Sequence, residues 1–393
     1  MMAAYDFIIV GAGFAGSILA ERLASENGKK ILLIEQRDHI AGNMYDYVDE
    51  HGVVIHKYGP HLFRTNSPRV LHYISQFTGW HPYQHRVLAS VKDQLVPVPF
   101  NLTSLERLLP DQAEELKALL VAEFGMDVKV PVSALRKHAD ERIREFGEFV
   151  FENVYLNYTT KQWGDKPENL DFETITARVP VHISYDDRYF QEQHQALPKD
   201  GYTKMFERML ANPLIEVRLS TKAVDVLSFE PNSGKILFMG EPYEGGVIYT
   251  GPIDELFGYK FGELPYRSLR FDLETHDVEF YQPCATVNYP NTQLYTRITE
   301  YKYLMASVPE KTTIMKEYPQ AYDRLVPAQS IPYYPIPKDS NAALYGKYLE
   351  LAREYQQLML VGRLAEYRYY DMNNIIERAL DVFDKEFKGD ESK

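Results

Sequence analysis

The stretch FIIVGAGFAGSILAERL, residues 7–23, decides the fold of this chain. An apolar run leads into three glycines spaced G-x-G-x-x-G, at Gly11, Gly13 and Gly16, and apolar residues at helical spacing follow them. A second apolar run, KILLIE, occupies residues 30–35. Strand, glycine turn, helix and strand in this order are typical of the Rossmann βαβ unit. The sequence therefore predicts an α/β fold built on a parallel sheet.

The glycine spacing predicts a dinucleotide site. The first glycine permits the tight turn, the second lets a pyrophosphate approach the backbone, and the third allows close contact of helix and strand. Glu35 ends the second apolar run, where a carboxylate can accept a bond from a ribose 2′-hydroxyl. A glycine-rich turn without a ligand is the alternative, and the flanking strand, helix and acidic residue argue against it.

Two further segments favour FAD over NAD as the dinucleotide. RDHIAGN, residues 37–43, follows the second strand and can extend the cofactor cradle. VGRLAEYRYYDM, residues 361–372, places Gly362, Arg363 and Asp371 between a late apolar strand and a helix. A late strand and helix of this kind often return to the flavin end of FAD, so we expect a flavoprotein.

The rest of the chain predicts two additional parts. Helical spacing extends from Leu105 to about Gly164, and short alternating strands dominate residues 265–335. GVIYTG, residues 246–251, indicates a strand that returns to the parent sheet. We therefore predict an α/β protein with a discontinuous Rossmann-like FAD-binding domain (1–80, 200–260 and 340–390), an inserted helical substrate domain (100–165) and an antiparallel β-sheet layer (83–99, 175–200 and 265–335).

Local patterns predict individual elements within these parts. Residues 68–77 and the segment after Met372 are expected to be helical, and residues 141–164 form the longest helical candidate. Residues 91–100 predict a hairpin with prolines at its edges. The segments LRFDLETHDVEF, CATVNYP and LYTRITEYKYL predict strands of the antiparallel layer.

Composition limits the classes of function. The chain has 393 residues and a formal net charge of −13, with both signs mixed along its length, which argues against nucleic-acid and anionic-membrane binding. We find neither a signal-peptide pattern nor a membrane-spanning apolar run. Cys284 is the one cysteine, and the histidines show no metal-ligand spacing, so no metal site is expected. These features predict a cytoplasmic protein.

Aromatic and basic residues mark a candidate substrate cleft. Tyr155, Tyr158 and Trp163 lie near a predicted helix end, where their rings either stack a nucleobase or form a core stripe. Arg178 and Arg297 lie on separate segments and are suited to clamping a diphosphate. A surface charge or an ordinary salt bridge explains each arginine taken alone.

Tyrosines and one histidine extend this cleft toward the predicted flavin. IPYYPIP holds Tyr334 between prolines, and EYRYYDM holds Tyr369 beside the late strand. Their hydroxyl groups are suited to orienting a phosphate or a sugar. His61 stands in a Gly-Pro-His turn and is the most suggestive histidine, whereas His56 is explained by packing or backbone hydrogen bonding.

The motifs GAGFAG, QRDHIAGN, YGPHLFRTN, YTTKQWG, YDDRYF, YTRITE, PYYPI and GRLAEYRYYDM occur in this order. Together they closely resemble the bacterial UDP-galactopyranose mutase family, from Tyr5 to about Phe387. The resemblance implies a FAD-dependent isomerase that interconverts UDP-galactopyranose and UDP-galactofuranose. It implies activity only with reduced flavin, whose N5 attacks the anomeric carbon while UDP leaves, before the ring recloses through the 4-hydroxyl. It further implies a homodimer, an external reductant such as NAD(P)H, and a furanose donor for cell-surface polysaccharides.

The resemblance also implies roles for individual residues. Arg178, expected on a mobile loop of roughly residues 164–188, and Arg297 bind the diphosphate, and His61 lies against the flavin ring. The implied catalytic residues are Arg178, Arg297, His61, Tyr334 and Tyr369. The implied substrate contacts are Tyr155, Tyr158, Thr159, Trp163, Arg178, Tyr189, Arg267, Asn288, Arg297, Glu317, Tyr334 and Tyr369. The implied cofactor contacts are Gly11, Gly13, Phe14, Gly16, Glu35, Gln36, Gly42, Asn43, His61, Leu62, Gly362, Arg363, Tyr369, Asp371 and Met372.

Two positions depart from the family pattern. Arg64 replaces a second histidine, and His85 stands where some members have asparagine. We expect both near the sugar pocket, where they could admit a related sugar such as UDP-N-acetylgalactosamine; Arg64 is equally explained as a substitution outside the pocket. A flavin amine oxidase-like oxidoreductase and a non-catalytic nucleotide-binding protein are the alternatives from other classes.

Overall fold

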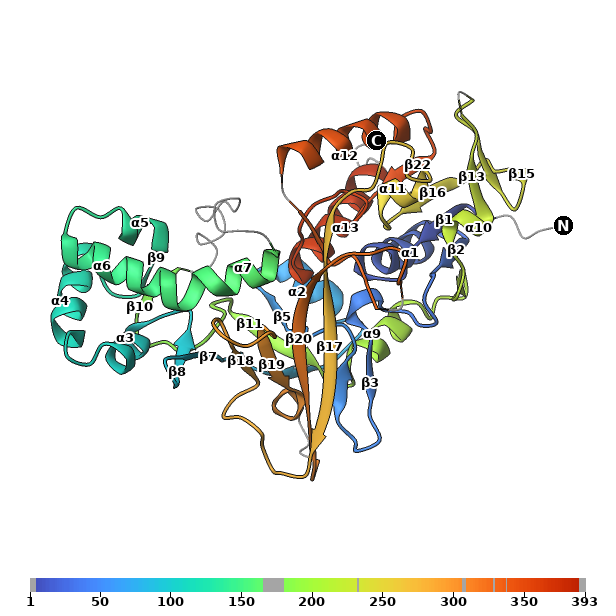
Figure 1. The fold of residues 1–393 in the computed structure, drawn as a ribbon. Coiled ribbons are helices and arrows are strands. Elements are labelled where there is room, and N and C mark those ends of the chain that lie inside the picture. The colour runs from blue at the N-terminus through green and yellow to red at the C-terminus, as the bar shows by residue number, and fades with distance from the viewer. Residues whose placement is uncertain are drawn as a thin grey trace.

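The computed structural model describes residues 5–164, 180–231, 233–305, 309–327, 329–336 and 338–388. A helical unit lies at one end of the molecule and the N-terminal nucleotide-binding unit at the other (Figure 1). Long paired strands run between them (Figure 1). The elements that carry the predicted site residues therefore come from three parts of the molecule.

A five-stranded sheet forms the core of the nucleotide-binding unit. All neighbouring strands pair in parallel, with Ile8 opposite both Leu32 and Val247. The predicted strands around residues 7–10, 31–34 and 246–249 are confirmed. In sheet order, the strands are β12 (Ile215–Arg218), β2 (Ile31–Ile34), β1 (Phe7–Val10), β16 (Gly246–Tyr249) and β22 (Leu358–Leu360).

Helices cover this sheet with apolar faces. The first helix begins after the glycine turn and buries Ile18, Leu19 and Leu23, and the predicted closing helix buries Ile376 and Phe383 in the same core. The predicted helix at residues 68–77 is present but ends at Ile74. The helices of this unit are α1 (Phe14–Asn27), α2 (Pro68–Ile74), α9 (Tyr202–Met209), α10 (Ala223–Val226), α11 (Ile253–Leu256), α12 (Asp339–Ala352) and α13 (Met372–Glu386), with a 3-10 turn at Gly42–Met44.

A seven-stranded sheet forms the central layer. The long strands β17 (Tyr266–His276) and β20 (Thr312–Ala321) pair antiparallel along their whole length, as predicted for this layer. One pairing, between β18 and β7, is parallel, so the sheet is mixed. The predicted strand LYTRITEYKYL ends at Glu300 and continues as a 3-10 turn at Tyr301–Leu304. The other strands are β21 (Tyr334–Pro335), β19 (Arg297–Glu300), β18 (Thr286–Asn288), β7 (Val87–Val91) and β8 (Gln94–Val98).

The helical unit has its own apolar core. The longest helical candidate is continuous from Glu141 to Trp163, but its middle turn, Phe151–Leu156, is a π-helix that the sequence pattern did not predict. Segments of this kind often occur at functional sites. A short strand, β9 (Val128–Val130), also lies within the predicted helical region. The helices are α3 (Leu102–Leu108), α4 (Ala113–Phe124), α5 (Val132–Arg136), α6 (Glu141–Val150) and α7 (Asn157–Trp163).

The strands between residues 180 and 200 pair outside the seven-stranded sheet, contrary to the expectation for residues 175–200. One of them, β10 (Val181–Ile183), pairs with β9 in the helical unit. The other, β11 (His194–Pro198), pairs with β5 (Phe63–Thr65) and β6 (Trp80–Pro82) of the nucleotide-binding unit. The chain between β10 and β11 therefore links two units. Smaller sheets join β3 (Asp46–Val48) to β4 (Val54–His56), and β13 (Leu227–Phe229) to β14 (Ile236–Phe238) and β15 (Glu241–Pro242).

Within these described ranges, every helix is too short or too polar to cross a lipid bilayer.

Candidate functional site

The glycine turn lies where the carboxyl ends of β1, β2 and β16 meet. The order β2-β1-β16 places β1 where the strand order reverses, the position at which open parallel sheets bind ligands. Gly11 has φ +100°, and a Cβ there would lie 2.1 Å from Oγ1 of Thr250. Position 11 therefore requires glycine for two reasons: its φ angle is positive, and the side chain of Thr250 leaves no room for a Cβ.

Close backbone approaches shape the rest of this turn. A Cβ on Gly16 would lie 1.9 Å from the carbonyl oxygen of Gly11, and a Cβ on Gly42 would lie 2.9 Å from Cα of Gly13. The N-cap of α1 is Gly13, which has no capping side chain, and the first turn of α1 has no acidic residue. Such a helix N-terminus is suited to binding an anion through its backbone amides.

Glu35 stands at the end of β2, beside the glycine turn. Its side chain is buried, and Oε2 accepts a bond from the backbone N–H of Ala12 at 2.9 Å, while Oε1 accepts one from the N–H of Arg37 at 3.0 Å. These bonds orient the carboxylate but leave acceptor capacity on both oxygens. Its predicted bond to a ribose stays a prediction.

Arg37 is a candidate cofactor residue that the sequence analysis missed. Its Nη2 donates to Oδ1 of Asn43 at 2.9 Å, and its guanidinium lies 4.3 Å from the ring centroid of Tyr58. Its Nη1 is buried and, among the described residues, has no hydrogen-bond partner. A guanidinium whose buried Nη1 has donors to spare among the described residues suits an anionic or polar ligand. Its place two residues after Glu35 is the signal that could have found it.

The other predicted cofactor residues differ in what they can offer. Phe14 is buried and packs on Phe206 with ring centroids 4.8 Å apart, so only its backbone is available to a ligand. Gln36 is exposed, whereas Leu62 and Met372 pack at the edge of the core. Gly362, at φ +117°, lies against Ala15 and Thr250. Arg363 lies in the loop after β22. It donates to the carbonyls of Tyr333 and Tyr370, and these bonds fix the orientation of its guanidinium.

The residues of the predicted cleft gather around Arg297 and Glu317, and this group of side chains is called the cleft. Arg297 and Glu317 are register partners on β19 and β20, and Nε and Nη2 of Arg297 both donate to Oε2 of Glu317, at 2.8 and 2.6 Å. Burial lowers the pKa of Arg297, but Glu317 and the nearby Tyr158 and Tyr334 together raise it by more than burial lowers it. The net pKa of Arg297 therefore lies above its usual value. The guanidinium therefore stays charged in a half-buried site.

Tyr334 and Tyr369 line the cleft next to this arginine. Their ring centroids lie 5.9 Å apart, and the guanidinium carbon of Arg363 lies 5.6 and 5.3 Å from those rings. The hydroxyl of Tyr369 donates to Oδ1 of Asp371 at 2.8 Å. Burial, with Glu317 next, raises the pKa of Tyr334, and burial, with Asp371 next, raises the pKa of Tyr369. Both hydroxyls are therefore protonated donors at neutral pH.

The helical unit brings Tyr155 and Tyr158 toward the same cleft. Tyr155 lies in the π-helical turn, and its buried hydroxyl has no hydrogen-bond partner among the described residues. Tyr158, one turn on, is near enough to Arg297, Glu317 and Tyr334 to alter its pKa, although burial dominates and raises it. The core-stripe alternative holds for Tyr155 in part, because its ring belongs to the core of the helical unit.

Two histidines of the predicted site are held neutral. Burial lowers the pKa of His61 to about 3, with His56, Arg363 and Arg297 adding to the effect. Burial, with Arg297 next, lowers the pKa of His85 to about 3. Nδ1 of His61 is buried and, within the described ranges, unpaired. His56, for which packing was the expected role, accepts a bond at Nδ1 from the backbone N–H of His61.

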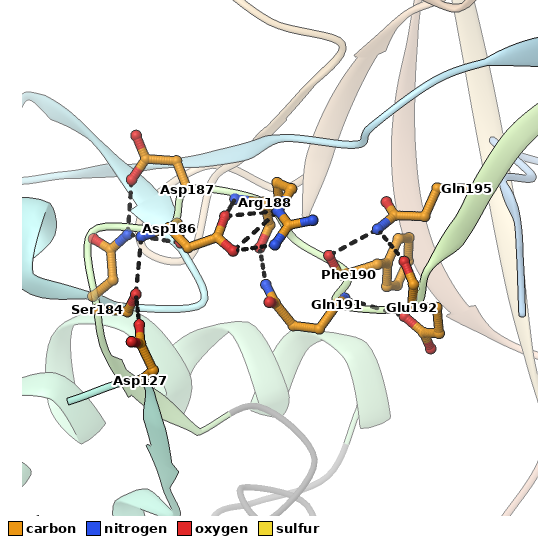
Figure 2. A network of polar contacts seen from close by, with 10 residues as sticks. Asp127, Ser184, Asp186, Asp187, Arg188, Phe190, Gln191, Glu192 and Gln195 are labelled. Carbon is orange, nitrogen blue, oxygen red and sulfur yellow. Dashed lines mark hydrogen bonds and ion pairs between the residues drawn. The ribbon is translucent and has the colours of Figure 1, made fainter. Parts of the chain in front are cut away.

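Tyr189 reaches the cleft on the segment that links β10 to β11. Figure 2 shows the polar contacts that shape this segment, including the pairing of Arg188 with Asp186 and the bonds from Gln195 Nε2 to the carbonyls of Phe190 and Glu192. The backbone N–H of Tyr189 donates to the carbonyl of His85, and the two rings lie 5.8 Å apart.

Other predicted substrate residues are placed differently. Arg267 donates to the carbonyl of Gln162 at 3.0 Å and so caps the end of α7. Arg64 binds the carboxylates of Glu192 and Asp371. Asn288 is the register partner of Arg297, Thr159 is buried in α7, and Trp163 is half-buried at its end. Arg178 and most of the predicted mobile loop lie outside the described residues.

Lys161 is a second residue that the sequence analysis missed. Its ammonium donates to the carbonyls of Tyr289, Gln293 and Tyr295, at 2.5, 3.0 and 3.4 Å. Burial lowers its pKa to about 8. These bonds attach α7 to the chain between Asn288 and Arg297, so the helical and sheet residues of the cleft hold a defined spacing.

Comparison with known proteins identifies the class and then the family. The family profile for the NAD(P)-binding Rossmann-like domain matches residues 9–77, and the profile for UDP-galactopyranose mutase matches residues 153–369. UDP-galactopyranose mutase of Mycoplasma genitalium is 37% identical over 377 residues, which cover 95% of this chain and 92% of that protein. The dTDP-fucopyranose mutase of Escherichia coli is 33% identical over 379 residues, covering 95% and 96% of the two chains.

A crystal structure of reduced UDP-galactopyranose mutase superimposes with a TM-score of 0.74 at 18% identity, covering 98% of this chain and 94% of that one. This likeness establishes the fold. The chain is therefore a protein with a dinucleotide-binding Rossmann-like domain, joined to a helical unit and a large mixed sheet. It belongs to the family of UDP-galactopyranose mutase enzymes, as the profile over residues 153–369 and the near full-length relatives show.

Proposed function

We propose that this protein is a FAD-dependent UDP-galactopyranose mutase that interconverts UDP-galactopyranose and UDP-galactofuranose. The observation that carries the proposal is the half-buried Arg297–Glu317 pair, bordered by Tyr158 and Tyr334. A fixed positive charge with protonated tyrosine hydroxyls around it suits a nucleoside diphosphate. A flavin amine oxidase-like enzyme needs the dinucleotide turn but has no need of this anion site.

The residues present fit FAD. Nη1 of Arg37 and Nδ1 of His61, which have no partner in the part of the chain that the structure describes, supply buried polar atoms, and Gly11 and Gly42 keep the cradle free of side chains. The N-terminus of α1 would hold the pyrophosphate and Glu35 the adenosine ribose. His61, Arg363 and the loop after β22 would hold the flavin end. When bound and reduced, FAD supplies a nucleophilic nitrogen for the anomeric carbon of the sugar.

The protein's own residues bind and orient the substrate. Arg297 holds the diphosphate through bidentate bonds and stabilises the charge that grows on it as the glycosidic bond breaks. The hydroxyl of Tyr334 donates to the same phosphates, with the ring of Tyr369 beside it, and Tyr155 and Tyr158 border the uridine. Glu317 keeps Arg297 in one orientation, because it binds two of its nitrogens. Arg178 is the second arginine of this proposal.

The proposal extends to the cellular setting. We propose a homodimer in the cytoplasm that receives electrons from an external reductant such as NAD(P)H and makes a furanose donor for polysaccharides. The single cysteine, Cys284, suits a reducing compartment. The net charge of −13 favours a small anionic substrate drawn in by local arginines over a polyanionic partner.

The test is conversion of UDP-galactofuranose by protein reduced with dithionite, with UDP-galactopyranose followed by chromatography. We expect product without net consumption of reductant, and no product from oxidised protein. Product from both forms at equal rates would contradict the cofactor role. Stoichiometric consumption of reductant would favour the oxidoreductase.

The same assay should include dTDP-fucopyranose and UDP-N-acetylgalactosamine. The relative from Escherichia coli carries the name of a dTDP-fucopyranose mutase, so the sugar and the base are both worth comparing. We expect the highest kcat/KM with the galactose substrate. A higher value with either alternative would correct the substrate and leave the reaction class unchanged.

A further inference from the structure

Arg64 occupies the centre of an ionic network at the junction of two units. Nη1 of Arg64 pairs with Oε1 of Glu192, and Nη2 donates to Oδ2 of Asp371 at 2.8 Å. The guanidinium carbon also lies 4.1 Å from the ring centroid of Phe190. The side chain of Arg64 is only 20% exposed, so these partners surround most of it. Both terminal nitrogens of Arg64 therefore bind carboxylates of the protein.

Two of the three partners of Arg64, Asp371 and Phe190, each contact a tyrosine of the cleft. Asp371 accepts the hydroxyl of Tyr369 through its other oxygen, Oδ1, at 2.8 Å. Phe190 packs edge-on against its neighbour Tyr189, with ring centroids 4.8 Å apart. These two tyrosines are separated by 180 residues of chain, and Arg64 is joined to both through one intermediate residue.

The backbone supports the same arrangement. Arg64 on β5 is the register partner of Gln195 on β11. Gln195 donates to the carbonyls of Phe190 and Glu192, which closes the turn that Arg64 binds from the other side (Figure 2). The position of the turn at residues 190–192 thus depends on the pairing of β5 with β11 and on the side chains of Arg64 and Gln195.

Charge balance gives Arg64 a second effect. Glu192 and Asp371 place two carboxylates beside a cleft that, on the proposed function, accepts a diphosphate. Arg64 bonds both of them, with side-chain exposures of 22% and 30%. Without Arg64, two unpaired negative charges would face an anionic substrate, which weakens its binding.

We propose that Arg64 is a positioning residue of the active site: it sets Tyr189 and Tyr369 for the substrate and neutralises Glu192 and Asp371, without contacting the sugar. This inference rests on the proposed function. It assigns a role to the departure from the family pattern at position 64, because a histidine side chain lacks the forked donors that bridge two carboxylates.

The test compares Arg64→Ala, Arg64→Lys, Glu192→Gln and the double variant Arg64→Ala/Glu192→Gln. Affinity for UDP is measured by calorimetry on the holoprotein, and kcat and KM by the mutase assay. We expect Arg64→Ala to weaken UDP binding and raise KM by ~10-fold each, with a smaller loss in kcat. Arg64→Lys keeps the charge and should recover part of both losses.

The double variant decides between positioning and a direct sugar contact. If Arg64 acts through the carboxylates, Glu192→Gln should improve UDP binding in the Arg64→Ala background by ~3-fold or more, because it removes one unpaired charge. If Arg64 contacts the sugar, Glu192→Gln cannot rescue Arg64→Ala, and Arg64→Ala leaves affinity for UDP, which has no sugar, unchanged. Either of these two results overturns the proposal.

Arg69→Ala is the matched control. Arg69 on α2 also bridges two carboxylates, Asp381 and Asp384 on α13, but it lies outside the cleft and is 41% exposed. We expect wild-type UDP affinity and kinetics from it. The calorimetric arm separates the two hypotheses: if the wild type binds UDP but converts no sugar, the proposed reaction fails, while the UDP affinities still decide the role of Arg64.

Discussion

The glycine turn and the tyrosine–arginine cleft are built in different ways. The turn is made by backbone close approaches within residues 11–16, with Gly42 and Thr250 as neighbours. The cleft is made by side chains that come from α7, β19, β20, β21 and the loop after β22. Gly11 and Gly16 leave no room for a side chain in the turn, whereas the cleft depends on charge and hydrogen-bond partners.

This difference implies that the two regions fail differently. A change in the turn should reduce both the stability of the fold and the binding of the cofactor, because its glycines let a strand and a helix approach closely in the core. A change in the cleft should reduce turnover and leave the fold and the cofactor in place. Substitutions in each region test whether the turn and the cleft respond in these two different ways.

The largest effect is expected from Gly16→Val. The new Cβ would lie 1.9 Å from the carbonyl oxygen of Gly11, a backbone atom, and 3.2 Å from Cγ2 of the buried Ile9. We expect a loss of ~3 kcal/mol or more in the free energy of unfolding and loss of bound flavin. Urea denaturation and visible absorbance of the purified protein measure these changes.

Gly346→Ala is the control for this substitution. Position 346 lies in α12, and an added Cβ meets no atom within 4 Å. We expect unchanged flavin content and a stability that is equal or up to ~1 kcal/mol higher, because alanine is the better helix former. Retention of flavin by Gly16→Val would show that the turn is not the cofactor site.

The second effect, on turnover alone, is expected from Arg297→Ala. We expect kcat/KM to fall by ~1000-fold, because the diphosphate loses a bidentate cation, while flavin absorbance is retained. The substitution also leaves Glu317 buried and unpaired, which costs stability. Arg297→Ala/Glu317→Gln should recover the stability and not the turnover.

The matched control is Arg270→Ala. Arg270 is 47% exposed on β17 and pairs with Asp272 on the same strand. Turnover should stay within ~2-fold of the wild type, because an exposed pair contributes little. Loss of flavin in Arg297→Ala would place Arg297 at the cofactor and erase the contrast between the two regions.

The smallest effect concerns acid stability and tests three buried histidines, His56, His61 and His85. Burial is the first cause that lowers the pKa values of His56, His61 and His85, to about 4, about 3 and about 3. In the unfolded chain these groups titrate at ~6.5. Below that pH the unfolded state binds more protons than the folded state, so the free energy of unfolding falls as the pH drops from ~6.5 toward 4.

Each histidine contributes up to ~1.4 kcal/mol per pH unit to this fall. His85→Asn should therefore flatten the dependence of the unfolding free energy on pH between 6 and 4 by at most that amount. Urea titrations at several pH values give the slopes of both proteins. Equal slopes would mean that His85 is protonated in the folded protein at these pH values.

Local sequence predicts the elements better than their pairing. The parallel strands, the first and last helices and the β17–β20 layer follow from apolar periodicity and glycine positions. The π-helical turn at residues 151–156 leaves no mark in that periodicity. The pairing of β10 and β11 outside the central sheet was missed, because strands of three to five residues carry little information on their partners.

The candidate site shows the same limit. The family motifs single out Arg297, Tyr334 and Tyr369 as residues, but no motif states that Glu317 holds Arg297 or that Asp371 holds Tyr369. Arg37 was missed because its significance lies in the buried Nη1, which has no hydrogen-bond partner among the described residues. Lys161 was missed because the three carbonyls that it binds are 128 to 134 residues away in the sequence.

By itself, the sequence determined that this chain has a Rossmann-like turn, because the turn's requirements are local: φ angles and the absence of side chains at fixed positions. The tertiary structure alone decided the partners of Arg64. Glu192 and Asp371 reach it from segments 128 and 307 residues away, and long-range pairing of this kind depends on how strands and units meet rather than on any local pattern.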